Sequence, residues 1–131
     1  MIARYSAEHE EIINAMGVLR RAASAGDLDA TAAAARDLAS LLDPHTASEE
    51  RSLFAELRLD PEFTDHVDGL CAEHRAIDGT IVRVGGGDLT SAAMLENMLR
   101  RHIDKEENGL FPAAVIALDG RAWERVVSAA S

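Results

Sequence analysis

The chain has 131 residues, of which 47% are hydrophobic, and its formal net charge is −10 at pH 7. This length and composition suit a single domain with its own core over residues 1–131. The negative charge disfavours nucleic acid and anionic membranes as partners, because phosphate groups are bound by clustered lysine and arginine. No apolar run reaches the roughly 18 residues that a membrane span needs, and the first residues lack the apolar stretch of a secretory signal, so we expect a cytoplasmic protein.

Apolar residues recur at helical spacing in four long segments, which predicts an all-α fold. The first helix is expected from about Ser6 to Ala25, with Gly26 ending it. The second is expected from Asp27 or Asp29 to about residue 57. A proline at position 44 should bend the second helix where it passes.

An Asp-Pro pair opens the third predicted helix, which runs over residues 61–84. Three consecutive glycines, 85–87, then force a turn. The fourth helix opens at residue 88 or 90 and reaches Pro112, where it must kink or stop, and a short amphipathic tail with Trp123 follows. Short connections favour antiparallel neighbours, so we expect an antiparallel up-down-up-down four-helix bundle with a short C-terminal helical tail.

Two ten-residue segments, 45–54 and 102–111, share the pattern H-x-x-x-E-E-x-x-L-F. A Glu-His pair precedes each copy, at 8–9 and at 73–74, so the chain resembles two related halves. Residues four apart lie on one face of a helix, and the histidine and the first glutamate of each copy can therefore reach the same centre. This is the spacing of metal ligands.

Each expected helix contributes one histidine to its inward stripe, and counting from the three turns places all four histidines at similar heights. Two glutamates share these stripes, and a buried carboxylate is costly unless it is paired or binds a cation. The sequence therefore predicts a metal site formed by His9, His45, Glu49, His74, His102 and Glu106. Because Cys71 is the only cysteine, a thiolate cluster is excluded. Imidazole with carboxylate suits iron, manganese or zinc in a dinuclear centre, and iron is our first choice.

Over roughly residues 5–112 these motifs resemble those of the hemerythrin-like, or HHE cation-binding, domains. The resemblance implies a single hemerythrin-like four-helix-bundle domain that binds dioxygen or peroxide, with hydrogen peroxide disproportionation as the candidate enzymatic activity. It implies two non-haem iron ions, oxo- or hydroxo-bridged when oxidised. The implied ligands are His9 and His45 on one iron, His74 and His102 on the other, and Glu49 and Glu106 as bridges.

The chain departs from the oxygen-carrying members of that family at two places. They have a further histidine where this chain has Leu70, and their last bridging carboxylate follows its histidine by five residues, whereas Glu106 follows His102 by four. Water, Tyr5 or Asp78 could fill the vacancy, since Tyr5 lies one turn before His9 and Asp78 one turn after His74. Two other functions stay open. One is an iron- or oxygen-sensing module without turnover, acting through a homodimer or a regulatory protein partner; the other is a zinc-stabilised structural bundle.

Four more glutamates adjoin the expected ligands. Glu50 and Glu107 can either face solvent or hydrogen-bond a ligand histidine, and we favour solvent. Glu8 and Glu73 are also expected to be surface charges. The last two residues of each repeated segment should form an apolar wall that limits water at the site, namely Leu53, Phe54, Leu110 and Phe111.

Overall fold

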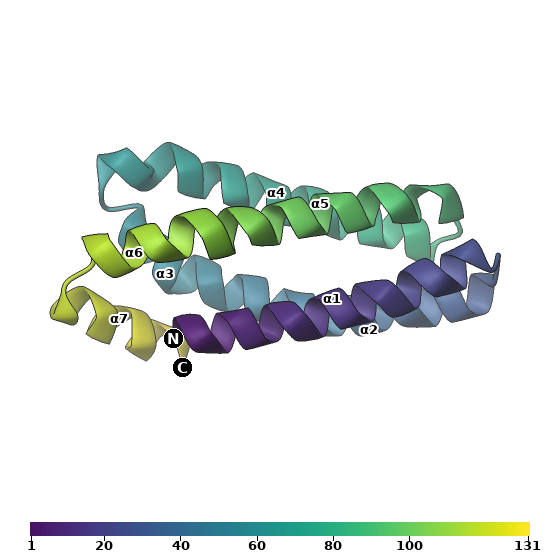
Figure 1. The fold of residues 1–131 in the computed structure, drawn as a ribbon, viewed down its shortest axis with the longest axis horizontal. Coiled ribbons are helices and arrows are strands. Elements are labelled where there is room, and N and C mark those ends of the chain that lie inside the picture. The colour runs from purple at the N-terminus through teal and green to yellow at the C-terminus, as the bar shows by residue number, and fades with distance from the viewer.

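The computed structural model describes residues 1–131 and is all-α, a four-helix bundle with an additional C-terminal helix (Figure 1). None of its helices has the length and apolar content needed to cross a membrane. The elements in chain order are α1 (Ile2–Ser24), α2 (Leu28–Arg51), α3 (Leu53–Leu57), α4 (Pro61–Gly85), the 3₁₀ turn η1 (Leu89–Ser91), α5 (Ala92–Lys105), the π-helical turn η2 (Glu106–Leu110), α6 (Phe111–Ala117) and α7 (Gly120–Ala130).

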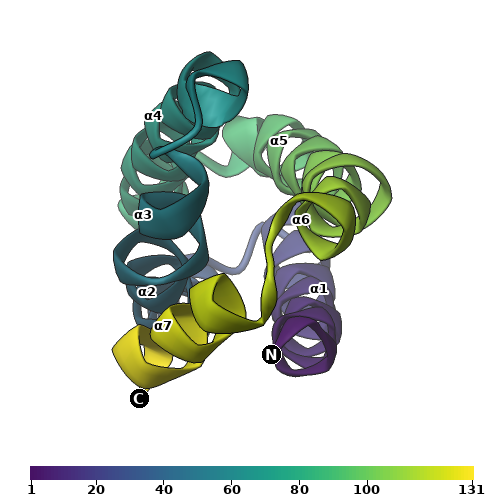
Figure 2. The same ribbon diagram turned by 90° about the vertical axis from the view of Figure 1, so that its left-hand side faces the viewer.

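Four rods stand at the corners of the bundle, formed by α1, by α2 with α3, by α4, and by α5 with α6 (Figure 2). Each rod packs against the next one in the chain, and the fourth packs against the first. Short turns join the rods, and two of these turns use glycines with positive φ, Gly26 at 70° and Gly87 at 117°. The predicted antiparallel bundle is therefore confirmed.

The predicted helix starts agree well with the structure. Asp27 caps α2 by accepting a hydrogen bond from the Ala30 N–H, and Asp60 caps α4 by accepting one from the Glu62 N–H. The first helix begins at Ile2, a turn earlier than the sequence suggests.

The predicted helix breaks agree less well. The second rod is interrupted at Ser52, whose φ of −115° and ψ of −90° are not helical, whereas α2 continues through Pro44. At Pro112, where a kink or a stop is expected, the fourth rod does not stop. Its hydrogen bonding changes to a π turn over η2, and Pro112 then lies in the first turn of α6, where a missing N–H costs little. The rod consequently continues to Ala117.

Two groups of buried apolar side chains fill the interior, one on each side of the predicted ligands. The aliphatic cluster, toward the Gly26 and Gly87 turns, is built from Ile12, Met16, Leu19, Ala23, Ala34, Ala35, Leu38, Leu42, Ile77, Ile81, Val84, Ala92, Leu95 and Leu99. The end cluster, which α7 closes, is built from Tyr5, Leu53, Phe54, Leu57, Val67, Leu70, Cys71, Leu110, Phe111, Ala114 and Val126. Along each rod, the predicted ligands lie between these two clusters.

Candidate metal centre

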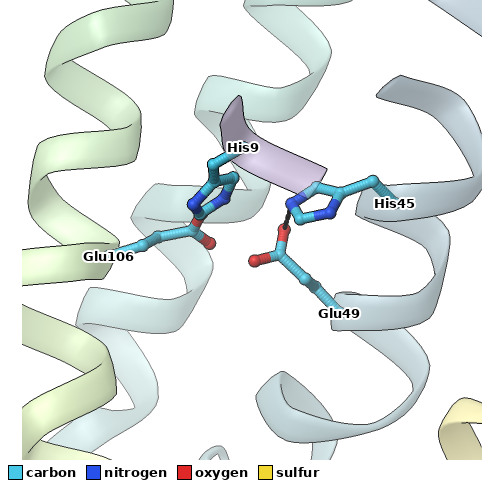
Figure 3. Close-up of side chains that lie close together, drawn as sticks. All are labelled: His9, His45, Glu49 and Glu106. Atoms are coloured by element: carbon cyan, nitrogen blue, oxygen red, sulfur yellow. Dashed lines mark ion pairs between the residues drawn. The ribbon is translucent and has the colours of Figure 1, made fainter. Parts of the chain in front are cut away.

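The structure brings all six predicted ligand residues together in one layer of the bundle. The four histidines are at most 4% exposed, and both glutamates are fully buried. Two groups form, each with ligand atoms within 4.8 Å of one another: His9 and His45, or His74 and His102, in each case with both Glu49 and Glu106. Figure 3 shows the first group, in which the two rings point toward the carboxylates. Because the glutamates belong to both groups, they lie between two adjacent candidate subsites.

The inward-facing atoms of these residues have no hydrogen-bond partner. They are the four histidine Nε2 atoms and all four carboxylate oxygens, and every one is buried. Nε2 of His9 lies 3.0 Å from Glu106 Oε1, and Nε2 of His45 lies 3.2 Å from Glu49 Oε1. The corresponding distances are 3.5 Å from His74 to Glu49 and 3.6 Å from His102 to Glu106. Buried polar atoms are normally satisfied, so eight such atoms facing one space point to cations as their partners.

The two carboxyl groups also titrate as a pair in the metal-free protein. Burial, together with the neighbouring charge of Glu49, raises the pKa of Glu106 well above its usual value. Burial opposes ionisation of Glu49 as well, but the adjacent imidazoles of His45 and His74 outweigh it and lower the pKa of Glu49. A metal would therefore compete with a proton at Glu106, because a bridging carboxylate must be ionised.

The histidines divide into two kinds. Burial lowers the pKa of His9, and burial with the nearby charge of His74 lowers the pKa of His102 to about 4. Burial also disfavours the charged form of His45 and of His74, but Glu49 outweighs it and raises the pKa of both. Each candidate subsite thus contains one imidazole that is readily neutral, which is the form that binds a metal.

The donor set fits a dinuclear centre of hard or borderline cations. Each group offers two imidazole nitrogens and carboxylate oxygens, and no thiolate is present because Cys71 lies in the end cluster. Such donors suit iron, manganese and zinc. Two overlapping groups that share both carboxylates are what a pair of bridged ions would need.

The expectation that the four adjoining glutamates face solvent is wrong. Each accepts a hydrogen bond from the Nδ1 of one histidine of the layer, at 2.7 to 3.0 Å, and their side chains are only 30% to 41% exposed. The pairs are Glu107 with His9, Glu8 with His45, Glu50 with His74, and Glu73 with His102. Residue spacing alone could not show this, because the partner histidine is always on another rod. The clue in the sequence was that both halves repeat these glutamates.

The expected apolar wall is present. Its four members belong to the end cluster. The Phe111 ring stacks on His9 with centroids 5.8 Å apart, and the Phe54 ring stacks on His74 with centroids 5.6 Å apart. These rings cover the ligand layer from the end cluster and limit the access of water.

The residues considered for the vacant ligand position lie elsewhere. The Tyr5 hydroxyl shares hydrogen bonds with the hydroxyls of Ser48, at 2.9 Å, and Ser52, at 2.8 Å. Asp78 is only partly buried and belongs to neither group of candidate ligands. Leu70 is buried in the end cluster. The four histidines and two glutamates are therefore the whole of the converging donor set.

A comparison with protein families gives a match. The model of the family described as the hemerythrin HHE cation binding domain matches residues 1–114, which include all six residues of the layer. Comparison with curated proteins gives no match, and comparison with solved structures gives none.

Proposed function

The chain belongs to the hemerythrin HHE cation-binding family, and from this premise we propose that it is a non-haem di-iron protein that binds dioxygen or peroxide. The observation that carries the proposal is the pair of overlapping groups with eight buried, unpartnered donor atoms. Two cations bridged by Glu49 and Glu106 would give all eight atoms a partner. A dry core without ions would leave each atom with an unmet desolvation cost of about 1 to 3 kcal/mol.

The chain's residues would hold the two ions in a fixed, polar and largely dry space. His9 with His45 would hold one ion and His74 with His102 the other, and Glu49 and Glu106 would be shared by both. Bound iron supplies the redox chemistry that the side chains lack. The stacked rings of Phe54 and Phe111 exclude bulk water and so favour small uncharged ligands.

A groove of about 500 Å³ between α1 and α5 supports an entry path for such a ligand. Ser6, His9, Asn14, Ile103 and Glu107 are among its lining residues. His9 therefore has one face toward the groove and its Nε2 toward the inward space. The groove would give a diatomic or peroxide ligand a route to the His9 side of the layer.

Iron loading combined with peroxide turnover tests the proposal. Metal-free protein is reconstituted anaerobically with ferrous iron, and the iron content, the absorption spectrum with and without azide, and the consumption of hydrogen peroxide are measured. We expect two iron ions per chain, azide-sensitive charge-transfer bands, and either reversible dioxygen uptake or conversion of two peroxides to two waters and one dioxygen in proportion to bound iron. The Glu49→Ala variant serves as the control that lacks a bridge.

Other outcomes would overturn the proposal in distinct ways. Protein that is colourless and contains zinc after purification from iron-replete cells would indicate a structural bundle. Iron-loaded protein that is inert to dioxygen and peroxide but changes its oligomeric state on reduction would indicate a regulatory module.

A further inference from the structure

The four outer hydrogen bonds form a closed ring around the bundle. Glu8 on α1 bonds His45 on α2, and Glu50 on α2 bonds His74 on α4. Glu73 on α4 then bonds His102 on α5, and Glu107 on η2, which continues α5, bonds His9 on α1. Each rod thus supplies one carboxylate to the next rod and receives one from the rod before it. We call these four residues the outer glutamates.

The direction of the ring follows from helix geometry. Neighbouring residues on a helix are 100° apart, so the residue next to an inward ligand points toward an adjacent rod. On α1 and α4 the outer glutamate precedes the inward residue, as in Glu8-His9, whereas on the other two rods it follows, as in Glu49-Glu50. Adjacent rods run in opposite directions. A glutamate that precedes the inward residue on one rod and a glutamate that follows it on the next rod therefore point the same way around the bundle. The repeated Glu-His and Glu-Glu pairs are therefore what a one-way ring requires.

Two of the imidazoles receive a second contact, from the same copy of the repeated segment that supplies their outer glutamate. Phe54 lies four residues after Glu50 and stacks on His74, which Glu50 bonds. Phe111 stands in the same relation to Glu107 and stacks on His9. Each copy of the repeated segment thus holds an imidazole of another rod in two ways. Its glutamate accepts the hydrogen bond from Nδ1, and its phenylalanine stacks on the face of the imidazole.

We propose that the outer glutamates are positioning residues that hold every imidazole with Nδ1–H outward and the Nε2 lone pair inward before a metal arrives. The reason is that an ionised carboxylate can only accept, so the neutral ring that it bonds must carry its proton on Nδ1. This inference rests on the proposed function for its consequence, the capture of two cations, but the tautomer itself exists without metal.

The outer glutamates also change the charge around the candidate metal centre. Together with the two inward glutamates, the outer glutamates place six carboxyl groups in and around the layer. Two of them form an ion pair with a cation, Glu8 with Arg4 and Glu73 with Lys105. Glu107 and Glu50 have no such cation partner. Excess negative charge favours the more highly charged, oxidised state of a bound metal. The outer glutamates therefore should hold the reduction potential of bound iron down.

Glu107 offers the best matched test. Its Oε1 accepts from His9 at 2.7 Å, and its Oε2 accepts from the Ser6 hydroxyl at 2.8 Å. Glu107→Ala removes the acceptor, and Glu107→Gln keeps the shape but lets the amide either accept or donate. Ser6→Ala removes the other partner of Glu107 and leaves the imidazole bond in place. Glu124→Gln, at an exposed position on α7, is the control for loss of one charge.

Three readouts separate positioning from a merely structural role. Imidazole ¹H–¹⁵N spectra of metal-free protein at pH 8 should show His9 as the Nδ1–H tautomer in the wild type and in both controls, and as a mixture in the two Glu107 variants. Zinc affinity by chelator competition should fall roughly 10- to 100-fold in Glu107→Ala and less in Glu107→Gln, since the amide oxygen still accepts. The midpoint potential of iron-loaded Glu107→Gln should rise above that of the Glu124→Gln control.

Failure of this inference is distinguishable from failure of the proposed function. Folded Glu107 variants whose His9 tautomer, zinc affinity and iron potential equal those of the controls would overturn the positioning role while leaving a metal centre intact. Wild-type protein that shows the Nδ1–H tautomer but binds neither zinc nor iron would support positioning and overturn the proposed function. If Glu107→Ala does not fold, Glu107→Gln with its tautomer spectrum still decides the question.

Discussion

The aliphatic cluster and the ligand layer are built on the same four rods, yet their packing follows opposite rules. In the aliphatic cluster fourteen buried side chains contain no charged group and need no partner beyond one another. In the adjacent layer six buried side chains present eight polar atoms that no part of the protein satisfies. The first region resembles an ordinary bundle core, and the second makes physical sense only with cations between its side chains.

This contrast shows how the molecule divides its tasks. The aliphatic cluster stabilises the bundle by burying apolar surface, so the rods stay aligned without help from the ligand layer. The layer can then contain groups that destabilise the metal-free protein. Stability and metal binding should accordingly respond to different substitutions.

The largest expected effect is on metal binding. Replacing Glu106 by glutamine removes one carboxylate shared by both groups, so affinity for both ions should fall by more than about 100-fold, beyond the loss typical of an outer hydrogen-bond partner. The metal-free variant should be at least as stable as the metal-free wild type at pH 7, because it no longer buries a carboxyl group whose ionisation is disfavoured by burial. Elemental analysis and urea denaturation measure the two effects. A Glu106→Gln protein that retains both ions would contradict the bridging role.

The next effect should appear in stability alone. Leu38 is fully buried in the aliphatic cluster, and Leu38→Ala should cost about 2 to 5 kcal/mol of unfolding free energy. The cost should be similar with and without metal, and the metal content should not change. The exposed Leu59 supplies the matched control, since Leu59→Ala should stay within about 0.5 kcal/mol of wild type. Loss of metal in folded Leu38→Ala would show that the two regions are not separable.

Acid should weaken the metal-free layer through His102. Its pKa falls from about 6.5 in the unfolded chain to about 4 in the folded protein, so the folded state binds fewer protons between these values. The stability that neutral His102 contributes is present above pH 6.5 and is lost as the pH falls toward 4. His45 and His74, whose pKa values are raised, act in the opposite sense. Comparison with His102→Gln isolates the effect, with His66→Gln at an exposed position as the control.

Urea denaturation of the metal-free proteins at several pH values checks this. The acid-induced loss of stability should be smaller in His102→Gln than in wild type. Equal pH profiles for the two proteins would contradict the prediction. They would mean that protonation of His102 does not destabilise the ligand layer.

The smallest predicted effect concerns Tyr5, which borders the layer from the end cluster. Tyr5→Phe removes hydrogen bonds to Ser48 and Ser52 and should cost about 0.5 to 1.5 kcal/mol. Metal content and the absorption spectrum should not change, because the hydroxyl bonds serines and not the inward space. A spectral shift in Tyr5→Phe would place the hydroxyl at the metal and extend the layer by one ligand.

Much of the layer could be predicted from local pattern, and the reason is geometric. His45 with Glu49, and His102 with Glu106, are four residues apart on single helices, so one face carries both. Bundle topology then placed the remaining histidines at the same height. Gly26 and Asp60 likewise affect only the backbone close to them in sequence. The turn at Gly26 and the helix cap at Asp60 were therefore predictable.

The features that were not predicted depend on contacts between rods or on local changes of helix geometry. The spacing of residues along one helix does not reveal either. Glu8 adjoins His9 but bonds His45, so its role depends on which rod stands beside α1. The continuation of the fourth rod past Pro112 depends on the π turn of η2, which proline rules for regular helices do not describe. The interruption at Ser52 is similar, since no proline or glycine marks it.

The most direct test of the central claim is the number of metal ions that one chain binds. Anaerobic titration of metal-free protein with ferrous iron, followed by elemental analysis after removal of free metal, should give two ions per chain. It should give none in the double variant Glu49→Gln with Glu106→Gln, which loses both shared carboxylates. A folded wild-type protein that retains no ion, or a double variant that retains two, would contradict the account.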